Sequence, residues 1–110
     1  MTKDTLGAVL DRLCATIDAR KNADADSSYT AQLLGKGAEH CARKFGEEAI
    51  ETIIAATRGK PEELTAEAAD VLYHLLVTLA AAGVSPDDVA AALTTREGTS
   101  GLDEKAARTD

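Results

Sequence analysis

The sequence predicts an all-α fold, a bundle of about five helices that forms one domain over residues 1–110 and is completed by homodimerisation. Three observations lead to this prediction. The composition is rich in alanine and other strong helix formers, with only 2 prolines. Apolar residues recur at spacings of three and four along most of the chain, and we find no strand pattern and no internal repeat. A chain of 110 residues provides only a modest core, so apolar stripes on several faces favour a bundle that is completed by a second copy.

The first two helices are predicted from apolar periodicity and capping residues. Leucine, valine and isoleucine at helical spacing predict a helix over about residues 5–20. The polar residues 21–28 are typical of a loop. Ser27 or Ser28 is expected to cap a short second helix that extends through Leu34.

Three further helices are predicted in the second half of the chain. A long helix is expected over about residues 38–57, and RGKP at 58–61 breaks it. The next helix should extend to about Ala82. Ser85, followed by proline and two acids, predicts the start of a fifth helix that ends near Gly98. We expect the tail, residues 98–110, to be ordered only in part.

The charge and the cysteines restrict the class of protein. The net charge is −7, without the basic patch that a nucleic-acid-binding protein usually carries. No uninterrupted apolar run approaches the length of a membrane span. Cys14 and Cys41 lie far apart, and no secretory signal precedes them, so we expect reduced packing thiols in a cytoplasmic protein. An acidic protein that handles phosphates needs metal ions between the two negative partners.

Two groups of acids form the main candidate site. Glu47, Glu48 and Glu51 crowd the middle of the third predicted helix. At 100° per residue they fall within an arc of about 100°, where like charges destabilise a helix. Glu67 and Asp70 lie on the fourth predicted helix.

The spacing of the two groups from the intervening turn suggests that they form one site. They lie about ten residues before and about nine residues after the break at 58–61, so an antiparallel hairpin would place them at a similar height. Carboxylates facing one another require cations, and Mg²⁺ or Mn²⁺ takes oxygen ligands of this kind. Two solvated faces that match by accident remain the alternative on spacing alone.

At this point the sequence resembles a known family. EEAIE followed by EAAD fits the EExxE…ExxD pattern of the MazG-like, all-α nucleotide pyrophosphohydrolases. The surrounding blocks SYTAQLLGKG, KFGEEAIETIIAAT, EAADVLYHLLVTL and REGTSGLDEKAAR resemble the phosphoribosyl-ATP pyrophosphohydrolase family in particular. The resemblance extends from about residue 6 to residue 108.

The resemblance implies a role for individual residues. It implies that Glu47, Glu48 and Glu51 are catalytic, and that the same three acids bind Mg²⁺ together with Glu67 and Asp70. It also implies a set of substrate- and phosphate-binding residues: Lys44, Arg20, Tyr29, Thr30, His74, Arg96, Ser100, Lys105 and Arg108.

The implied activity is Mg²⁺-dependent hydrolysis of phosphoribosyl-ATP to phosphoribosyl-AMP and pyrophosphate, the second step of L-histidine biosynthesis. Water attacks between the α- and β-phosphates, and either Glu48 or Glu51 accepts its proton. The partners expected are a small-molecule nucleotide and a second copy of the chain, without nucleic acid or membrane. Two alternatives are a house-cleaning nucleoside triphosphate pyrophosphohydrolase of the same superfamily and a non-catalytic helical dimerisation module.

Overall fold

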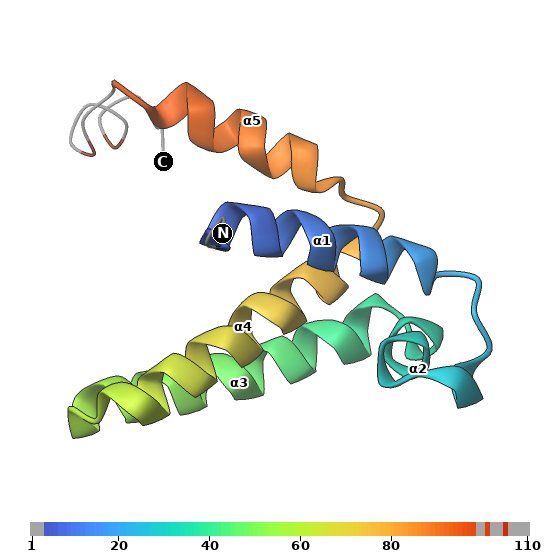
Figure 1. Ribbon diagram of the computed structural model, residues 1–110, viewed down its shortest axis with the longest axis horizontal. Coiled ribbons are helices and arrows are strands. Elements are labelled where there is room, and N and C mark those ends of the chain that lie inside the picture. Colours follow the sequence, from blue (N-terminus) through green and yellow to red (C-terminus); the bar gives the residue numbers. More distant parts are fainter. Residues whose placement is uncertain (1–3, 99–100, 102–104, 106–110) are drawn as a thin grey trace.

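The computed structural model describes residues 4–98, 101 and 105, and this part of the chain is helical without any strand. Figure 1 shows the arrangement of its elements. They are, in order, α1 (Leu6–Ala19), η1 (Ala25–Ser27), α2 (Tyr29–Lys36), α3 (Ala38–Arg58), α4 (Pro61–Ala81) and α5 (Pro86–Arg96). The all-α prediction is therefore confirmed.

Three of the helices, α1, α2 and α5, begin after a residue whose hydroxyl oxygen accepts a hydrogen bond from the first turn. The Oγ1 of Thr5 accepts from the N–H of Ala8 at 3.1 Å, and the Oγ of Ser28 accepts from the N–H of Ala31 at 3.0 Å. Ser28, rather than Ser27, is thus the cap of the short helix. Ser27 belongs instead to η1, a short 3₁₀ turn inside the predicted loop.

The α3 and α4 helices form the long antiparallel hairpin that carries the acidic residues (Figure 1). Gly59 ends α3 with φ 69°, in the left-handed region that glycine adopts without steric cost. Pro61 then occupies the first turn of α4, where its missing N–H costs no hydrogen bond. The connection is therefore short and sets the height at which residues of the two helices meet.

The buried core lies where the first four helices meet. Ile17, Leu33, Cys41 and Val77 form one cluster, with a single residue from each of α1, α2, α3 and α4. The Sγ–H of Cys41 donates to the carbonyl oxygen of Leu33 at 3.1 Å. Both cysteines are free thiols, as predicted from their spacing.

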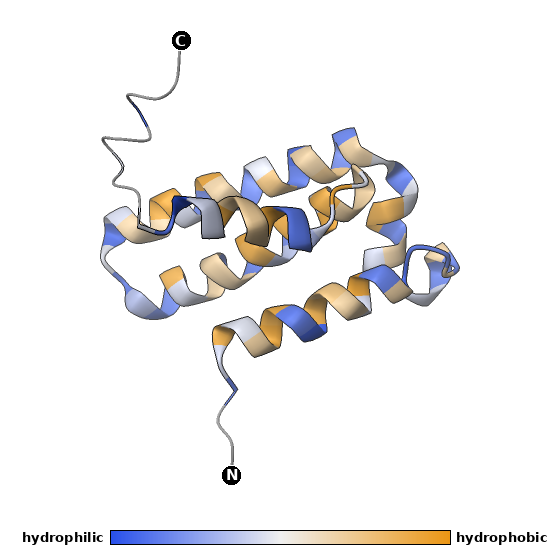
Figure 2. Cartoon of the chain, turned by 90° about the horizontal axis from the view of Figure 1, so that it is seen from above, coloured by the Kyte–Doolittle hydropathy of each residue, from blue (hydrophilic) through white to orange (hydrophobic). Residues whose placement is uncertain are grey.

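Much apolar surface remains outside this core. Ile50, Ile53 and Ile54, part of the apolar stripe expected on the third helix, are 59%, 62% and 46% exposed. The residues of α5 are exposed along its length. Figure 2 shows hydrophobic residues recurring along all the long helices rather than on one covered face. The single chain therefore leaves apolar side chains of α3 and α5 open to solvent, outside the buried core.

By length and composition, α4 would be able to cross a membrane, although the sequence offers no uninterrupted apolar run. The mean hydropathy of its most apolar stretch is 1.3, because alanines and leucines dilute its few charges. Such a helix is weak evidence for a span, since core helices pass the same test. Glu67 and Asp70 lie on this helix and face acids of α3 instead.

Candidate active site

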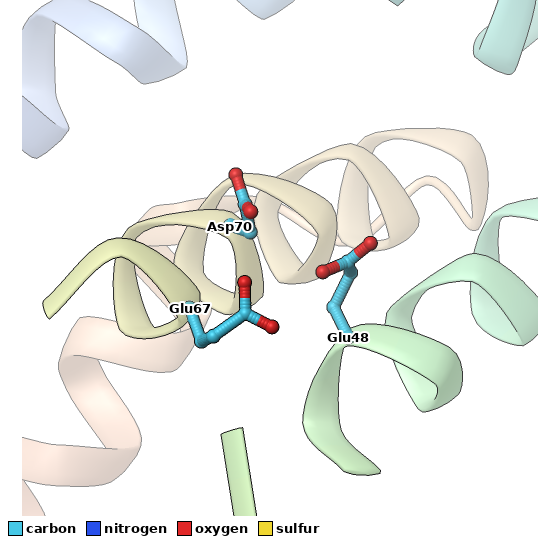
Figure 3. Close-up of side chains that lie close together, drawn as sticks. All are labelled: Glu48, Glu67 and Asp70. Carbon is cyan, nitrogen blue, oxygen red and sulfur yellow. The ribbon is translucent and has the colours of Figure 1, made fainter. Parts of the chain in front are cut away.

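The acids of the two long helices meet across the hairpin. A carboxylate oxygen from each of Glu48, Glu67 and Asp70 lies within 4.8 Å of the other two. Figure 3 shows Glu48 reaching from α3 toward Glu67 and Asp70, which project from α4. The two groups that lie on either side of the turn in the sequence are therefore adjacent in space.

Thr52 connects the backbones of the two acid-bearing helices. Its Oγ1 lies 2.8 Å from the carbonyl oxygen of Glu48 and 3.2 Å from the carbonyl oxygen of Glu67. One hydroxyl proton is shared between these two acceptors. The backbone of Glu48 is thereby held beside the backbone of Glu67, and their side chains begin from a fixed separation.

The electrostatics of the cluster are those of acids that repel one another. Partial burial raises the pKa of Glu48 to about 7, with further contributions from a hydrogen bond to Glu51 and from the charges of Glu51, Asp70 and Glu67. The pKa of Glu67 is also raised, by burial and then by Glu51 and Asp70. Glu51 therefore lies next to both residues as a fourth carboxylate. Without a cation, the cluster favours retention of a proton.

Glu47 and Lys44 form a separate pair beside the cluster. The Nζ of Lys44 lies 3.2 Å from the Oε1 of Glu47. This hydrogen bond and the charge of Glu47 raise the pKa of the lysine, with smaller contributions from Tyr29 and Glu48. Glu47 is not one of the three acids whose oxygens lie within 4.8 Å. Glu47 therefore faces Lys44, whereas Glu48 faces the acids of α4, although the sequence pattern gives both residues the same expected role.

A buried histidine and two tyrosines lie next to this pair. His74 is only 6% exposed, and its Nδ1 has no hydrogen-bond partner among the described residues. Its ring makes edge contacts with Tyr73 at 5.0 Å and Tyr29 at 6.4 Å between centroids. Burial lowers the pKa of His74, and the nearby charge of Lys44 lowers it further. Both effects favour the neutral form of the imidazole.

The hydroxyls of Thr30 and Tyr73 are hydrogen-bonded at 2.6 Å and connect α2 to α4. Tyr29 stacks on Tyr73 with 6.5 Å between ring centroids, yet Tyr29 is 52% exposed. Tyr29, Thr30 and His74, which the family resemblance links to substrate, are thus neighbours next to Lys44.

The remaining candidate residues lie elsewhere or outside the description. Arg20 caps the end of α1 and is exposed. Arg96 is exposed in the last turn of α5. Lys105 is helical and exposed, whereas Ser100 and Arg108 lie outside the described residues. None of these residues belongs to the carboxylate trio.

Sequence reasoning missed two features of the site. Thr52 stands four residues after Glu48, where a hydroxyl can bond to the carbonyl one turn earlier, but its contact with the other helix has no local sequence signal. A cavity of about 440 Å³ also extends from Glu51 and Glu67 toward the tip of the hairpin. Its size depends on how closely the two helices approach, which periodicity does not specify.

Fold and site together define a class of protein: an all-α chain with a carboxylate cluster suited to a hard divalent cation between antiparallel helices. The family model described as phosphoribosyl-ATP pyrophosphohydrolase matches residues 10–97. The chain belongs to the phosphoribosyl-ATP pyrophosphohydrolase family.

Curated relatives agree with this assignment over nearly their whole length. A phosphoribosyl-ATP pyrophosphatase of Cereibacter sphaeroides is 64% identical over 100 residues, which cover 91% of this chain and 97% of the relative. Proteins of the same name from Dinoroseobacter shibae and Ruegeria pomeroyi are 63% and 61% identical, each covering 92% of this chain, with 99% and 96% of the relatives covered.

Proposed function

We propose that this chain hydrolyses phosphoribosyl-ATP to phosphoribosyl-AMP and pyrophosphate, the second step of L-histidine biosynthesis. Membership of the family and the names of the relatives support the reaction. The observation that carries the proposal for this chain's own residues is the convergence of Glu48, Glu67 and Asp70 from the two long helices.

We assign the carboxylate cluster to Mg²⁺, with Mn²⁺ as the alternative ion. Glu48, Glu67 and Asp70 supply oxygen ligands within 4.8 Å of one another, and Glu51 lies beside them. The residues fit a divalent cation because positive charge placed between them offsets both the partial burial and the mutual repulsion that raise the pKa of Glu48. Such an ion supplies charge neutralisation for the phosphates and activation of a bound water.

The other acids have roles that follow from their positions. We assign Glu51 as the proton acceptor for the attacking water, because it borders both the carboxylate trio and the adjoining cavity. Glu47 positions Lys44 through the 3.2 Å ion pair. The ammonium group of Lys44 then neutralises phosphate oxygens on that side of the cluster.

Tyr29, Thr30 and His74 complete the substrate side near Lys44. The half-exposed ring of Tyr29 can contact a ligand bound there directly, whereas the buried His74 packs against the Tyr29 ring with 6.4 Å between centroids and supports its position. Arg20, Arg96, Ser100, Lys105 and Arg108 remain candidates for outer phosphate contacts.

The proposal also covers the assembly and the location of the enzyme. We assign the chain to the cytoplasm as a single-domain homodimer over residues 1–110 that acts on a small nucleotide, with no nucleic acid or membrane as partner. The exposed Ile50 and Ile53 of α3 support the dimer.

The decisive experiment measures pyrophosphate release from phosphoribosyl-ATP with Mg²⁺ and after chelation. We expect turnover with Mg²⁺ and loss of at least about a hundredfold in EDTA. Parallel assays with ordinary and oxidised deoxynucleoside triphosphates test the house-cleaning alternative. Faster turnover of those triphosphates than of phosphoribosyl-ATP would overturn the assigned substrate.

A further inference from the structure

A cavity lies next to the carboxylate cluster, between α3 and α4. It has a volume of about 440 Å³ and shares Glu51 and Glu67 with the cluster. Ile54, Ala55 and Ala66 provide apolar lining between the two helices. A volume of this size accommodates a small organic ligand, and the apolar lining suits the flat face of a base.

Arg58 and Glu63 lie at the far end of this cavity. Arg58 stands seven residues after Glu51, so its Cα lies about 10 Å farther along α3. The cavity therefore connects an acidic end, suited to a metal-bound triphosphate, with a guanidinium group at its far end.

The ion pair at that end is weak enough to exchange partners. The Nη1 of Arg58 lies 3.7 Å from the Oε2 of Glu63, and the two side chains are 61% and 43% exposed. Exposed pairs of this kind contribute little, whereas a phosphate accepts two parallel N–H bonds from a guanidinium. The Glu63 carboxylate, once released, can accept hydrogen bonds from ribose hydroxyls.

We propose that this cavity holds the nucleoside of the substrate and that Arg58 binds the phosphate of the added phosphoribosyl group. This inference rests on the proposed function. Phosphoribosyl-ATP differs from ATP in a second phosphate-bearing ribose attached to the adenine. This second phosphate is separated from the triphosphate by the nucleoside and the further ribose. A cation at the far end of the cavity from the triphosphate site therefore distinguishes the two molecules, so Arg58 is a specificity-determining residue.

Calorimetric titration of the Mg²⁺-loaded protein with phosphoribosyl-AMP and with AMP tests the assignment. We expect Arg58→Gln to weaken phosphoribosyl-AMP binding about tenfold to a hundredfold and to leave AMP binding within about twofold. Arg58→Lys should restore part of the difference. Arg12→Gln is the matched control, because Arg12 is 60% exposed and forms a similar ion pair, with Asp4 at 3.1 Å on α1.

Ala66→Phe provides a second test that does not depend on charge. The ring should fill the cavity and weaken the binding of both nucleotides. Unaltered nucleotide binding in this variant, or equal effects of Arg58→Gln on the two nucleotides, would overturn the assignment. Failure of the proposed function is seen separately, as absence of pyrophosphate release by the unmodified protein.

Discussion

Glu48 projects from the middle of α3 toward two acids of α4, and its partial burial with these neighbours raises its pKa to about 7. Glu47, the preceding residue, instead forms an ion pair with Lys44. A difference of 100° around the helix thus separates a candidate metal ligand from a residue that positions a lysine.

The first prediction concerns this difference. Glu48→Gln should lower kcat/KM by at least about a hundredfold and weaken Mg²⁺ binding, because the cluster loses a ligand charge. Glu47→Gln should weaken Mg²⁺ binding less, since its carboxylate lies outside the trio. Steady-state assays and Mg²⁺ titration measure both effects, with the exposed Glu62→Gln as control. Equal effects of Glu47→Gln and Glu48→Gln on Mg²⁺ affinity would contradict the geometry.

The second prediction concerns pH in the metal-free protein. A carboxyl whose folded pKa lies near 7, against an ordinary value of 4.5, stabilises the fold at low pH and loses this contribution as pH rises through about 7. Relative to Glu48→Gln, the chelated protein should therefore lose about 1 kcal/mol between pH 5 and pH 8, after allowance for solvent screening.

Thermal melts in EDTA measure this difference. About 1 kcal/mol corresponds to a shift of roughly 4 °C in Tm for a domain of this size. Added Mg²⁺ should restore the loss at pH 8, because the cation removes the repulsion. Parallel curves for the two proteins from pH 5 to pH 8 would refute the expectation.

Sequence spacing was sufficient to predict that the acids form one group, but not which acids of α3 face α4. The hairpin register placed Glu48 and Glu67 at a common height, and the structure brings them together. Which member of EExxE faces α4 depends on the rotation of the two helices at contact, which no local pattern encodes. The Thr30–Tyr73 hydrogen bond could not be predicted either, because it joins residues 43 apart in sequence and depends on how α2 and α4 pack.

The α3–α4 hairpin brings the acids of α3 and the acids of α4 together in one site. Each helix has 21 residues, and Thr52 contributes a side-chain hydrogen bond that crosses between their backbones. The position of this bond beside Glu48 and Glu67 means that slippage of one helix would alter the cluster directly.

The third prediction follows from this bond. Thr52→Val keeps the shape of the side chain but removes the hydroxyl, so stability should fall by about 1 kcal/mol. Activity should fall about fivefold if the Glu67 backbone relaxes by a comparable free energy. Thr57→Val is the control, because the Oγ1 of Thr57 donates to Ile54 of its own helix at 2.8 Å. Denaturant melts and turnover assays should separate the two variants, and identical behaviour would count against a cross-helix role.

Element boundaries were well predicted because the end signals are local. Thr5, Ser28 and Ser85 each cap the helix that follows, and the third helix ends at Arg58, one residue beyond its expected limit. The 3₁₀ turn at Ala25–Ser27 was missed because Asp24, which accepts from the N–H of Asp26 at 3.1 Å, lies within a polar stretch that resembles an ordinary loop.

At the level of the whole molecule, α3 and α5 leave large apolar side chains open to solvent. Ile50 and Ile53 are 59% and 62% exposed, and α5 adds Leu93 at 58%. Only 11% of the most apolar stretch of α4 is buried within the chain. These faces are typical of a surface that a second copy covers.

The fourth prediction tests that second copy. Light scattering at micromolar concentration should give a dimer for the unmodified chain and a monomer for Ile53→Glu, because a buried charge without a partner is costly. Gln32→Glu, which adds the same charge at an exposed position of α2, should remain dimeric. A monomeric unmodified chain would rule out the proposed assembly.

The role of the tail, residues 98–110, was predicted only from the family resemblance. GTSG carries little helical periodicity, and of the candidate residues beyond Gly98 only Lys105 is described. Its contribution to the substrate site therefore remains a prediction from the family pattern.

The turn at Gly59 fixes where α4 begins and therefore which way its acids face. Inserting one residue into α4 between this turn and Glu67 would rotate Glu67 and Asp70 by about 100° about the helix axis relative to the turn. Glu67 and Asp70 would then swing away from Glu48 with no change to any acid. The number of residues between the turn and Glu67 therefore matters to the cluster as much as the acids themselves, and we expect length variation in this family to be tolerated at the termini and excluded from this stretch.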